Sequence, residues 1–343
     1  MLLSRGMRIV RLDAADDDGL RACHEVHKAA QAVDDPLEPT MSLAVYRVWL
    51  RHGWDSNPGE VWFVPGEEAG QAIACYRLDL PDKEDKDRGF LLPTVHPAAR
   101  RAGIGAELLR HAAGRAAANE RTMLGGVAVQ DSAGDAFARQ VGAKPGLVEA
   151  RRVLDLRTIP AGQFARLREE AAAKAAGYTV VTWTGPTPQE HLDRVADAFN
   201  AMNDAPRDEG YEDSIWDAER IRERADRILR ETDVRGYTVA ALDDATGELA
   251  GFTQVEVDPA HPEWGHQALT SVTKRHRGHR LGLLTKAAML EWLATAEPQI
   301  ERIVTGNAES NKYMIAVNET LGYRLFGPGW QFCEIPVRDA AAA

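Results

Sequence analysis

The sequence predicts an α/β (α+β) protein built from two tandem copies of one folding unit, each with a mixed central sheet flanked by helices. The chain has 343 residues, more than a single hydrophobic core usually organises, so two domains are expected. Two basic, glycine-containing stretches, 96–116 and 273–293, resemble each other, and Arg277 aligns on Arg100 at an offset of 177 in the numbering. The predicted strands and helices also follow the same order in both halves.

Each copy begins with a short strand and continues with two helices. Alternating apolar residues predict strands over 7–12 and 178–183. Apolar residues at helical spacing predict the four helices 18–33, 41–54, 188–202 and 216–232.

A β-hairpin follows in each copy, over 59–81 and 235–259, where two alternating runs flank an acidic turn that contains glycine. The strands 89–95 and 266–272 then lead into the basic turns. A longer helix comes next, and in the second copy its apolar residues have nearly helical spacing: Leu284, Ala287, Ala288 and Leu293.

A further strand, a short helix and terminal strands complete each copy. Segment 131–143 aligns with 311–323 at an offset of 180, so the second copy has three additional loop residues. The stretch between the copies is rich in Ala, Glu and Arg and ends at Gly177, as a helix does. The predicted division is an N-terminal domain 1–157, a helical linker 158–177 and a C-terminal domain 178–338.

Composition excludes several classes of protein. A formal net charge of −11 argues against a nucleic-acid binder. The three cysteines are far apart and have no metal-binding spacing, which indicates neither a disulfide framework nor a metal site and fits a reducing cytoplasm. No segment approaches the ~20 apolar residues of a membrane span, and the N-terminus lacks the apolar core of a signal peptide. We therefore expect a cytoplasmic protein that binds neither nucleic acid nor membranes.

The basic turn before each long helix is typical of an anion-binding site. The first N–H groups of a helix have no partner within the helix, and the helix dipole favours negative charge there. Glycine lets a diphosphate approach the backbone, and neighbouring arginines add charge-assisted hydrogen bonds. Neither copy has the GxGxxG or GxxxxGK[ST] pattern of nucleotide sites. The alternative is a solvated basic helix start.

This turn resembles the acetyl-CoA signature of the GNAT acetyltransferase superfamily, Arg/Gln-x-x-Gly-x-Gly/Ala after a strand that ends in Val-x-Pro. "VHPAARRAGIG" (95–105) matches it fully, whereas "VTKRHRGHRLG" (272–282) has Arg280 in place of the middle glycine and lacks the proline. Asn311 and Gly322 lie where many members keep an Asn and a Gly before an aromatic residue. The resemblance covers nearly the whole chain, once per half, so it looks like a tandem GNAT protein of the kind common in actinobacteria, with a splayed sheet in each half.

The resemblance implies how acetyl-CoA would bind. The pantetheine arm would pair with backbone near the strand-ending valine, the following backbone amides would hold the pyrophosphate, and Asn311 would contact the CoA arm. The implied cofactor residues are Val95, Arg100, Arg101, Gly103 and Gly105 in the first copy, and Val272, Thr273, Arg277, Gly278, His279, Arg280, Leu281, Gly282 and Asn311 in the second.

Acyl transfer to an amine needs a base that removes a proton. Some GNAT enzymes place this base four or six positions before the valine, which gives Ala268 or His266 in the second copy but Leu91 or Gly89 in the first. His266 is a candidate because imidazole titrates near neutrality. Glu256, on the adjoining hairpin strand, is the second candidate. The alternatives are a loop histidine and an outward-facing strand carboxylate.

The leaving thiolate usually receives a proton from an acid. GNAT members often have a Tyr four residues before the Gly of the last block, but this chain has Asn318 there, and Ala138 in the first copy. Asn318 can donate a hydrogen bond to sulfur but cannot deliver a proton. Solvent or a group elsewhere would supply it.

The second copy is expected to be the catalytic half. It keeps Asn311 where the first copy has Asp131, whose charge is unfavourable beside a phosphorylated cofactor. It also has a longer polar loop, 203–216, suited to a cationic amine, although solubility and a helix cap at Ser214 or Asp213 fully explain half of its acids. Four residues of this loop are assigned to acceptor binding: Asp204, Glu209, Tyr211 and Trp216. The glycine signature is cleaner in the first copy, so whether one or both halves bind acetyl-CoA stays open.

These features predict an acetyl-CoA-dependent N-acetyltransferase that acts on a small-molecule amine, such as an antibiotic or specialised metabolite, as a monomer or homodimer. Two alternatives stay open. One is an acyltransferase that uses a longer acyl-CoA or an acyl carrier protein, whose acidic face the basic turn would meet. The other is a non-catalytic CoA-binding sensor or scaffold, motivated by the missing Tyr at 138 and 318.

Overall fold

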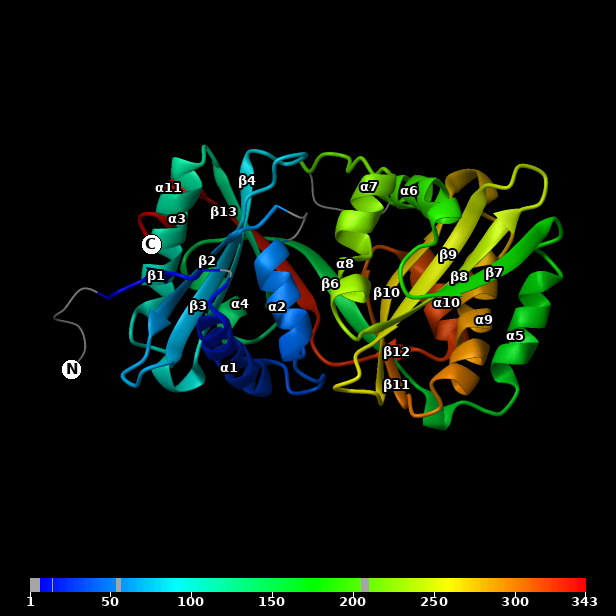
Figure 1. Ribbon diagram of the computed structural model, residues 1–343, viewed down its shortest axis with the longest axis horizontal. Helices are drawn as coiled ribbons and strands as arrows, with labels where there is room; N and C mark the ends of the chain where they lie inside the picture. Colours follow the sequence, from blue (N-terminus) through cyan, green and yellow to red (C-terminus); the bar gives the residue numbers. More distant parts are fainter. Residues whose placement is uncertain (1–6, 14, 54–56, 205–209) are drawn as a thin grey trace. The chain divides into compact units, whose positions relative to one another are not determined.

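The computed structural model describes residues 7–13, 15–53, 57–204 and 210–343 and confirms the mixed α/β architecture (Figure 1). The chain forms two compact units. Unit 1 comprises Met1–Val148, Gly210–Glu212 and Pro328–Ala343, and unit 2 comprises Glu149–Glu209 and Asp213–Gly327. Within the described ranges, no helix is both long and apolar enough to span a membrane.

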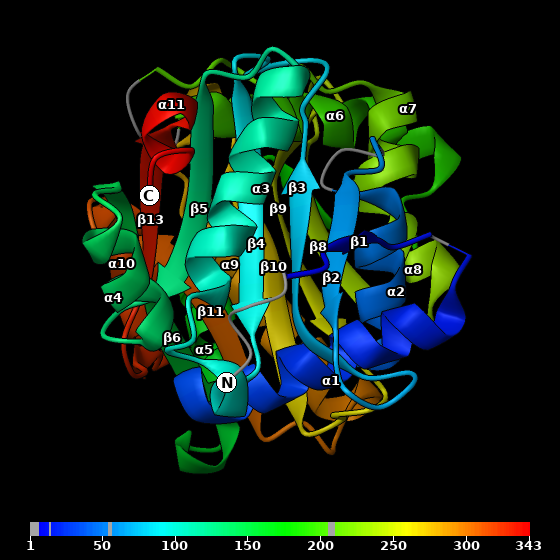
Figure 2. The ribbon, with the colours of Figure 1, turned by 90° about the vertical axis from the view of Figure 1, so that its left-hand side faces the viewer.

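Unit 1 contains a mixed sheet of order β1-β2-β3-β4-β5-β13, in which β4 and β5 are parallel and the other pairs antiparallel. Its strands are β1 (Val10–Arg11), β2 (Glu60–Pro65), β3 (Ala72–Asp79), β4 (Arg88–Val95), β5 (Met123–Val129) and β13 (Trp330–Pro336). Its helices are α1 (Asp17–Asp34), α2 (Leu43–His52), α3 (Ile104–Ala118), α4 (Ala133–Gln140) and α11 (Val337–Ala340), with the turn η1 (Pro97–Ala99) before α3. Figure 2 shows α3 across the strands of this sheet.

Unit 2 repeats this plan with the order β7-β8-β9-β10-β11-β6, in which β10 and β11 are parallel. Its strands are β6 (Lys144–Asp155, from Glu149 onward), β7 (Tyr178–Thr184), β8 (Arg235–Asp243), β9 (Leu249–Val257), β10 (Trp264–Val272), β11 (Arg302–Ala308) and β12 (Arg324–Leu325). Its helices are α5 (Gln163–Ala172), α6 (Leu192–Asn200), α7 (Ala218–Arg220), α8 (Arg227–Glu231), α9 (Leu281–Ala296) and α10 (Lys312–Leu321). Short turns join them: η2 (Leu156–Thr158), η3 (Gln189–His191), η4 (Ala201–Asp204), the π-helical η5 (Ile221–Ala225) and η6 (Lys274–His276).

The hairpins of the two units repeat each other residue for residue. Val64 pairs with Ala74 in unit 1, and Ala241 pairs with Gly251 in unit 2, both at the offset of 177. The same register shift follows in both hairpins. The offset found in the sequence is therefore also the offset of the strand register.

The last strand of each sheet comes from the other half of the chain. The sequence-based division assigned residues up to 157 to the first domain and 178–338 to the second. In the structure, residues 149–155 of β6 pair with β11 in unit 2, and β13 pairs with β5 in unit 1. Since both copies offer an equivalent strand edge, the pattern predicts a terminal strand without specifying which edge it joins.

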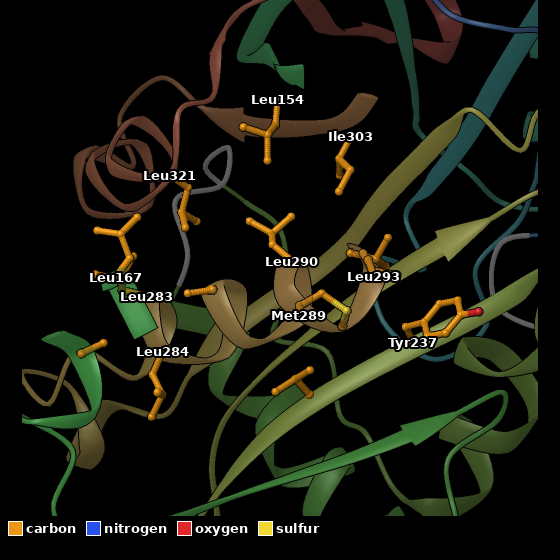
Figure 3. Close-up of a cluster of buried hydrophobic side chains, with 14 of the residues drawn as sticks. Leu154, Leu167, Tyr237, Leu283, Leu284, Met289, Leu290, Leu293, Ile303 and Leu321 are labelled. Atoms are coloured by element: carbon orange, nitrogen blue, oxygen red, sulfur yellow. The ribbon is translucent and has the colours of Figure 1, made fainter. Parts of the chain in front are cut away.

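The main core of unit 2 surrounds α9, the helix that follows the basic turn. The predicted apolar stripe covers only part of it, because α9 is buried on most sides between the sheet and α5. Figure 3 shows Leu283, Leu290 and Leu293 in one cluster with Leu154 and Ile303 of the sheet. Tight packing of this kind fixes the start of α9, and with it the basic turn.

Candidate functional site

The two parallel strands at the centre of each sheet separate along their length. In unit 2, β10 and β11 pair only where Trp264–His266 meets Arg302–Val304, although the strands continue to Val272 and Ala308. In unit 1, β4 and β5 part after Phe90 in the same way. The inner strand edges then face a wedge and have no pairing with each other. Backbone groups along such an edge suit an extended ligand that carries amides.

A β-bulge lies where the wedge opens in unit 2. The register between β10 and β9 shifts between Gln267 and Leu269, which leaves Ala268 without an opposite residue. The buried Gln267 amide donates hydrogen bonds to the Thr253 hydroxyl at 2.9 Å and to the Leu269 carbonyl at 3.0 Å. In unit 1 the pairing of β3 with β4 continues without a shift. Bulges re-aim side chains next to active sites.

Glu256 and His266, the two candidate bases, lie directly opposite each other across β9 and β10. Opposite residues of an antiparallel pair project from the same face, so these side chains are neighbours. Burial, and secondly the charge of Asp226, raises the pKa of Glu256 to about 7. Burial lowers the pKa of His266, although the side chain is accessible to solvent.

Asp226 is a functional candidate that sequence reasoning missed. It is 2% exposed, and its carboxylate accepts hydrogen bonds from the Thr187 backbone N–H at 2.9 Å and the Thr187 hydroxyl at 3.1 Å. It follows the π-helical turn η5, and it borders a small internal cavity together with Thr238 and Gln254. Burial raises the pKa of Asp226. No sequence signal marked this residue, because the segment 216–232 has the pattern of one regular helix.

The basic turn of unit 2 presents free backbone amides. Arg280 has a left-handed conformation (φ 57°), and no side chain of the described residues caps the helix that follows. The first helical hydrogen bond runs from the Leu284 N–H to the Arg280 carbonyl, so the amides of residues 281–283 have no partner in the helix. Helices α1, α2, α4 and α10, in contrast, begin at a side chain that accepts such a hydrogen bond.

Unit 1 has the same turn with one exchange. Arg101 and Gly103 have left-handed conformations (φ 65° and 80°), as do Gly278 and Arg280 at the offset of 177 (φ 92° and 57°). Each turn thus puts one Gly and one Arg at its two left-handed positions, in opposite order. Alternating left- and right-handed residues aim successive amides into one concavity, which favours an anion. No heavy atom of the described residues comes within 4 Å of a Cβ built on Gly103 or Gly278, so space is open there.

The arginines of the signature divide into two groups. Arg277 donates to the Val272 carbonyl at 3.3 Å and to Asp204 at 3.3 Å. Arg100 donates to the Val95 carbonyl at 3.1 Å and binds Asp34 through both guanidinium nitrogens at 2.6–2.7 Å. These two side chains brace the turn. Arg101 and Arg280 are exposed and form no ion pair among the described residues, so they are the cations left for a ligand.

Other predicted residues of the turn have structural contacts. The Thr273 hydroxyl donates to the Ala250 carbonyl at 3.1 Å, and the His279 ring lies 5.4 Å from the ring of Tyr178. Leu281 is buried in the core, and a Cβ on Gly282 would lie 3.7 Å from Val272. The feature that marks this turn as a candidate site is therefore its backbone amides without a partner in the helix, and not these side chains.

Asn311 and Asn318 both lie on or beside α10. The Asn311 side chain caps this helix by accepting a hydrogen bond from the Met314 N–H at 3.2 Å. Asn318 is fully buried and donates to Asn307 at 2.7 Å, while its Oδ1 has no hydrogen-bond partner among the described residues. Neither Asn311 nor Asn318 is an acid, so neither can supply the proton that a Tyr at position 318 would supply.

The structure describes three of the four loop residues assigned to the acceptor, and each has a contact of its own. Asp204 pairs with Arg277, and Glu209 lies outside the described residues. Tyr211 belongs to unit 1, where its hydroxyl donates to Glu334 at 2.8 Å. Trp216 is buried against Phe199, with ring centroids 4.5 Å apart. Each of these three side chains is held by a partner outside the loop, and their assignment to acceptor binding stays a prediction.

Lys286 is an unexpected buried cation on α9. It is 2% exposed, and its Nζ lies 4.9 Å from the ring centre of Tyr323. Burial lowers the pKa of Lys286 to about 7. The equivalent position of unit 1, at the offset of 177, is the buried Leu109. Burying a charge where the other unit buries an apolar residue is costly. At this position unit 2 has a buried cation and unit 1 does not.

Comparison with known proteins agrees with the geometry. The model of the Acetyltransferase (GNAT) family matches residues 29–143, which include the turn of unit 1. The chain is 28% identical over 229 residues to the mycothiol acetyltransferase of Mycolicibacterium paratuberculosis (strain ATCC BAA-968 / K-10), covering 66% of each, so it spans just under two-thirds of that relative. It is 27% identical over 259 residues to the mycothiol acetyltransferase of Mycobacterium leprae (strain Br4923), covering 73% of this chain and 76% of the relative.

Solved structures extend the similarity to nearly the whole chain. A tandem GNAT protein from the clavulanic acid biosynthesis pathway, determined without AcCoA, is 28% identical, with a TM-score of 0.77 over 96% of this chain and 98% of that one. A GCN5-related N-acetyltransferase from Sphaerobacter thermophilus is 16% identical with a TM-score of 0.63, and it shares the fold over 96% of each chain.

Proposed function

Because the chain is a tandem protein of the GNAT superfamily, we propose that unit 2 transfers an acetyl group from acetyl-CoA to the amine of a small molecule. The observation that carries the proposal is the pairing of Glu256 with His266 where β10 and β11 separate, beside the bulge at Ala268. A wedge for an amide-bearing arm, an anion-binding turn and a proton acceptor with a pKa of about 7 then belong to one unit.

Glu256 acts as the base in this proposal. An amine is protonated at neutral pH and becomes a nucleophile only when it loses a proton. A carboxylate whose pKa is near 7 can accept that proton at physiological pH, whereas an ordinary glutamate, with a pKa near 4.3, is too weak a base. His266, opposite it, is neutral at the same pH because its pKa is lowered, so it can hold the amine by a hydrogen bond.

The reaction is balanced by the groups present and by solvent. The ammonium proton passes to Glu256, the freed amine nitrogen attacks the thioester carbonyl, and the carbon–sulfur bond breaks to give an acetamide and a thiolate. The second proton that the nitrogen loses goes to solvent. Asn318 cannot protonate that thiolate, so water supplies the proton. The amides of residues 281–283, with Arg280, would hold the diphosphate of the donor.

The acceptor is inferred to be a small, cationic amine. Glu256 and the buried Asp226 give this face of unit 2 a negative character that attracts an ammonium group. The relatives act, by their names, in mycothiol acetylation and in a clavulanic acid pathway. A metabolite amine of such a pathway is our proposed substrate class, and a longer acyl donor remains the alternative on the donor side.

The experiment is an assay of the full chain with acetyl-CoA and a panel of amines, including the amine that mycothiol acetyltransferases acetylate. Released thiol reports turnover, and calorimetry reports donor binding separately. We expect thiol release that Glu256→Gln abolishes while donor affinity is kept. A second candidate function, a CoA-binding sensor, is favoured by Asn318, which offers no proton. Tight donor binding without turnover across the panel would support the sensor and contradict the enzyme.

A further inference from the structure

Three potential metal ligands meet beside the basic turn of unit 2. They are Asp243 at the end of β8, Glu248 at the far side of the hairpin turn, and His276 in η6. One ligand atom from each lies within 4.8 Å of the other two. An imidazole and two carboxylates form a donor set that suits divalent first-row transition ions.

The distance between His276 and Glu248 fits an ion better than it fits a hydrogen bond. His276 Nε2 lies 3.6 Å from Glu248 Oε2, which is too long for a hydrogen bond. Both atoms are buried, and neither has a hydrogen-bond partner among the described residues. Two such atoms at 3.6 Å, each about 2.1 Å from one ion, subtend an angle of about 118° at it, close to tetrahedral. His276 is only 7% exposed, so its nitrogen is aimed at this gap and shielded from bulk water.

The neighbours of the cluster support the same interpretation. His276 Nδ1 is hydrogen-bonded to the Tyr178 hydroxyl at 2.9 Å, which fixes the ring and leaves Nε2 facing the carboxylates. Metal-binding histidines are oriented by such a second hydrogen bond. Glu248 uses its other oxygen to pair with Arg275 at 2.8 Å. That guanidinium opposes a cation, but its side chain is 69% exposed and is free to turn into solvent.

The repeat shows that the fold does not require these ligands. The equivalent positions of unit 1, at the offset of 177, are Gly66, Gln71 and Ala99, none of which offers a carboxylate or an imidazole. The turn of unit 1 nevertheless closes with a hydrogen bond from the Gly66 N–H to the Gln71 carbonyl at 2.8 Å. The equivalent bond from Asp243 to Glu248 is 2.9 Å long. In unit 2 the Asp243 carboxylate also accepts hydrogen bonds from the Ala245 N–H at 3.2 Å and the Thr246 hydroxyl at 2.9 Å. Glu248 and His276 are therefore the side chains that the repeat shows the fold does not require.

We propose that Asp243, Glu248 and His276 bind one divalent transition-metal ion, of which Zn²⁺ is the probe. The ion links the hairpin turn to the segment that leads into the left-handed residues of the basic turn, since His276 precedes Gly278 by two positions. Metal binding therefore stiffens the start of the anion site. A further consequence, tighter CoA binding in the presence of the ion, rests on the proposed function.

The test uses the full chain after treatment with a chelator. Zn²⁺ is titrated by calorimetry and followed by thermal unfolding, and Co²⁺ is titrated in parallel because its visible absorption reports coordination. We expect one ion per chain and a melting temperature that rises with the ion concentration. His276→Ala and Glu248→Gln should remove this binding. Each introduces the residue that unit 1 carries at the same place, so both variants are expected to fold.

Two further variants sharpen the test. Tyr178→Phe removes the orienting hydrogen bond and should weaken Zn²⁺ affinity by about 10–100-fold. Glu68→Gln, in the equivalent turn of unit 1, should leave the affinity unchanged. No binding by the wild-type chain, or equal binding by His276→Ala, overturns the proposal, the latter as an adventitious ion only. Because these measurements involve no acyl donor, they are independent of the acetyltransferase assignment.

Discussion

Units 1 and 2 share the backbone geometry of the basic turn, which favours an anion, but differ where the proposed proton transfer would take place. In unit 2, Glu256 faces His266 across a bulged strand pair. The position of unit 1 equivalent to Glu256 is Asp79, which is buried and ion-paired with Arg77 at 2.6 Å. Gly89 takes the place of His266. Unit 1 therefore keeps the backbone geometry of the basic turn and lacks the opposed carboxylate and imidazole of unit 2.

A second difference concerns what covers the strands. In unit 1, the ring of Tyr211 stacks on Phe90, with centroids 6.2 Å apart, at the point where β4 and β5 separate. The guanidinium of Arg88 lies 4.5 Å from the ring centre of Tyr211 and pairs with Glu334. These side chains therefore lie beside the point where β4 and β5 separate. Under the proposed function, donor binding and chemistry would depend on separable parts of this fold, so that one copy could keep the first and lose the second.

The largest expected effect comes from the carboxylate proposed as the base, tested against its counterpart in unit 1. Glu256→Gln removes the proton acceptor and should lower kcat by about 10²–10⁴-fold, because general bases contribute that much. Asp79→Asn in unit 1 should leave kcat unchanged but leave the buried Arg77 charge without its partner, which costs ~3–5 kcal/mol of stability. Steady-state kinetics and denaturant unfolding of both variants check the pair. Loss of turnover in folded Asp79→Asn would place chemistry in unit 1 instead.

The glycines of the turns give the next effect. A Cβ on Gly282 makes only an ordinary contact, at 3.7 Å from Val272, so Gly282→Ala should be tolerated, whereas Gly282→Leu would fill the space before the free amides. We expect about 10–100-fold weaker acetyl-CoA binding for the leucine variant, equivalent to the loss of one or two good contacts.

Calorimetry also counts the sites. Gly105→Leu is the matched change in unit 1, although there a Cβ already lies 3.3 Å from Phe137. If both units bind the donor, each variant lowers the stoichiometry from two to one. If only unit 2 binds it, Gly105→Leu changes nothing, and wild-type affinity in Gly282→Leu contradicts the choice of unit 2.

Much of the fold could be predicted from the sequence because the repeat doubles every signal. Hairpin turns and basic turns recur at a constant offset of 177, and the strand register preserves that number. The exchange of β6 and β13 was not predictable, because both copies offer the same strand edge. Local pattern specifies that a strand forms, whereas the choice between equivalent partners depends on the path of the connecting chain.

The site divides in the same way. His266 could be chosen by its distance from Val272, and Glu256 by its place on the adjoining hairpin strand. Their direct opposition depends on the bulge at Ala268, which no sequence pattern indicated. Arg277 was expected to bind phosphate, and the structure engages it with Asp204, 73 positions away in the chain. Its role toward a ligand stays a prediction. Long-range ion pairs of this kind are invisible to spacing because they depend on tertiary contact.

A smaller effect, on stability, tests Lys286, the buried cation of unit 2. The pKa of Lys286 is lowered from 10.5 to about 7, so between these values the unfolded chain holds a proton that the folded chain lacks. Stability therefore falls as the pH drops from 10.5 to 7, and the penalty is constant below pH 7. Lys286→Leu, which copies Leu109 of unit 1, should raise the free energy of unfolding at pH 7 by at least ~1 kcal/mol. Denaturant unfolding should show this gain shrinking toward pH 10. A less stable variant at pH 7 would mean that Lys286 is held by an interaction that outweighs its burial.

The smallest expected effect is a shift in the pH profile of acyl transfer. Since Glu256 must be deprotonated to act as the base, kcat/KM should rise with pH around a midpoint near 7. Burial is the main cause of that raised pKa and the charge of Asp226 the second, so Asp226→Asn should move the midpoint to lower pH by less than one unit. Thr187→Val removes the hydroxyl that donates to Asp226 but keeps its charge, so it should not move the midpoint downward. If the two variants shift the profile equally, loosened packing rather than the Asp226 charge sets the proton affinity of Glu256. Unit 1 pairs the equivalent carboxylate, Asp79, with Arg77. The two units would then differ by that ion pair, and the charge of Asp226 in unit 2 would not add to the difference.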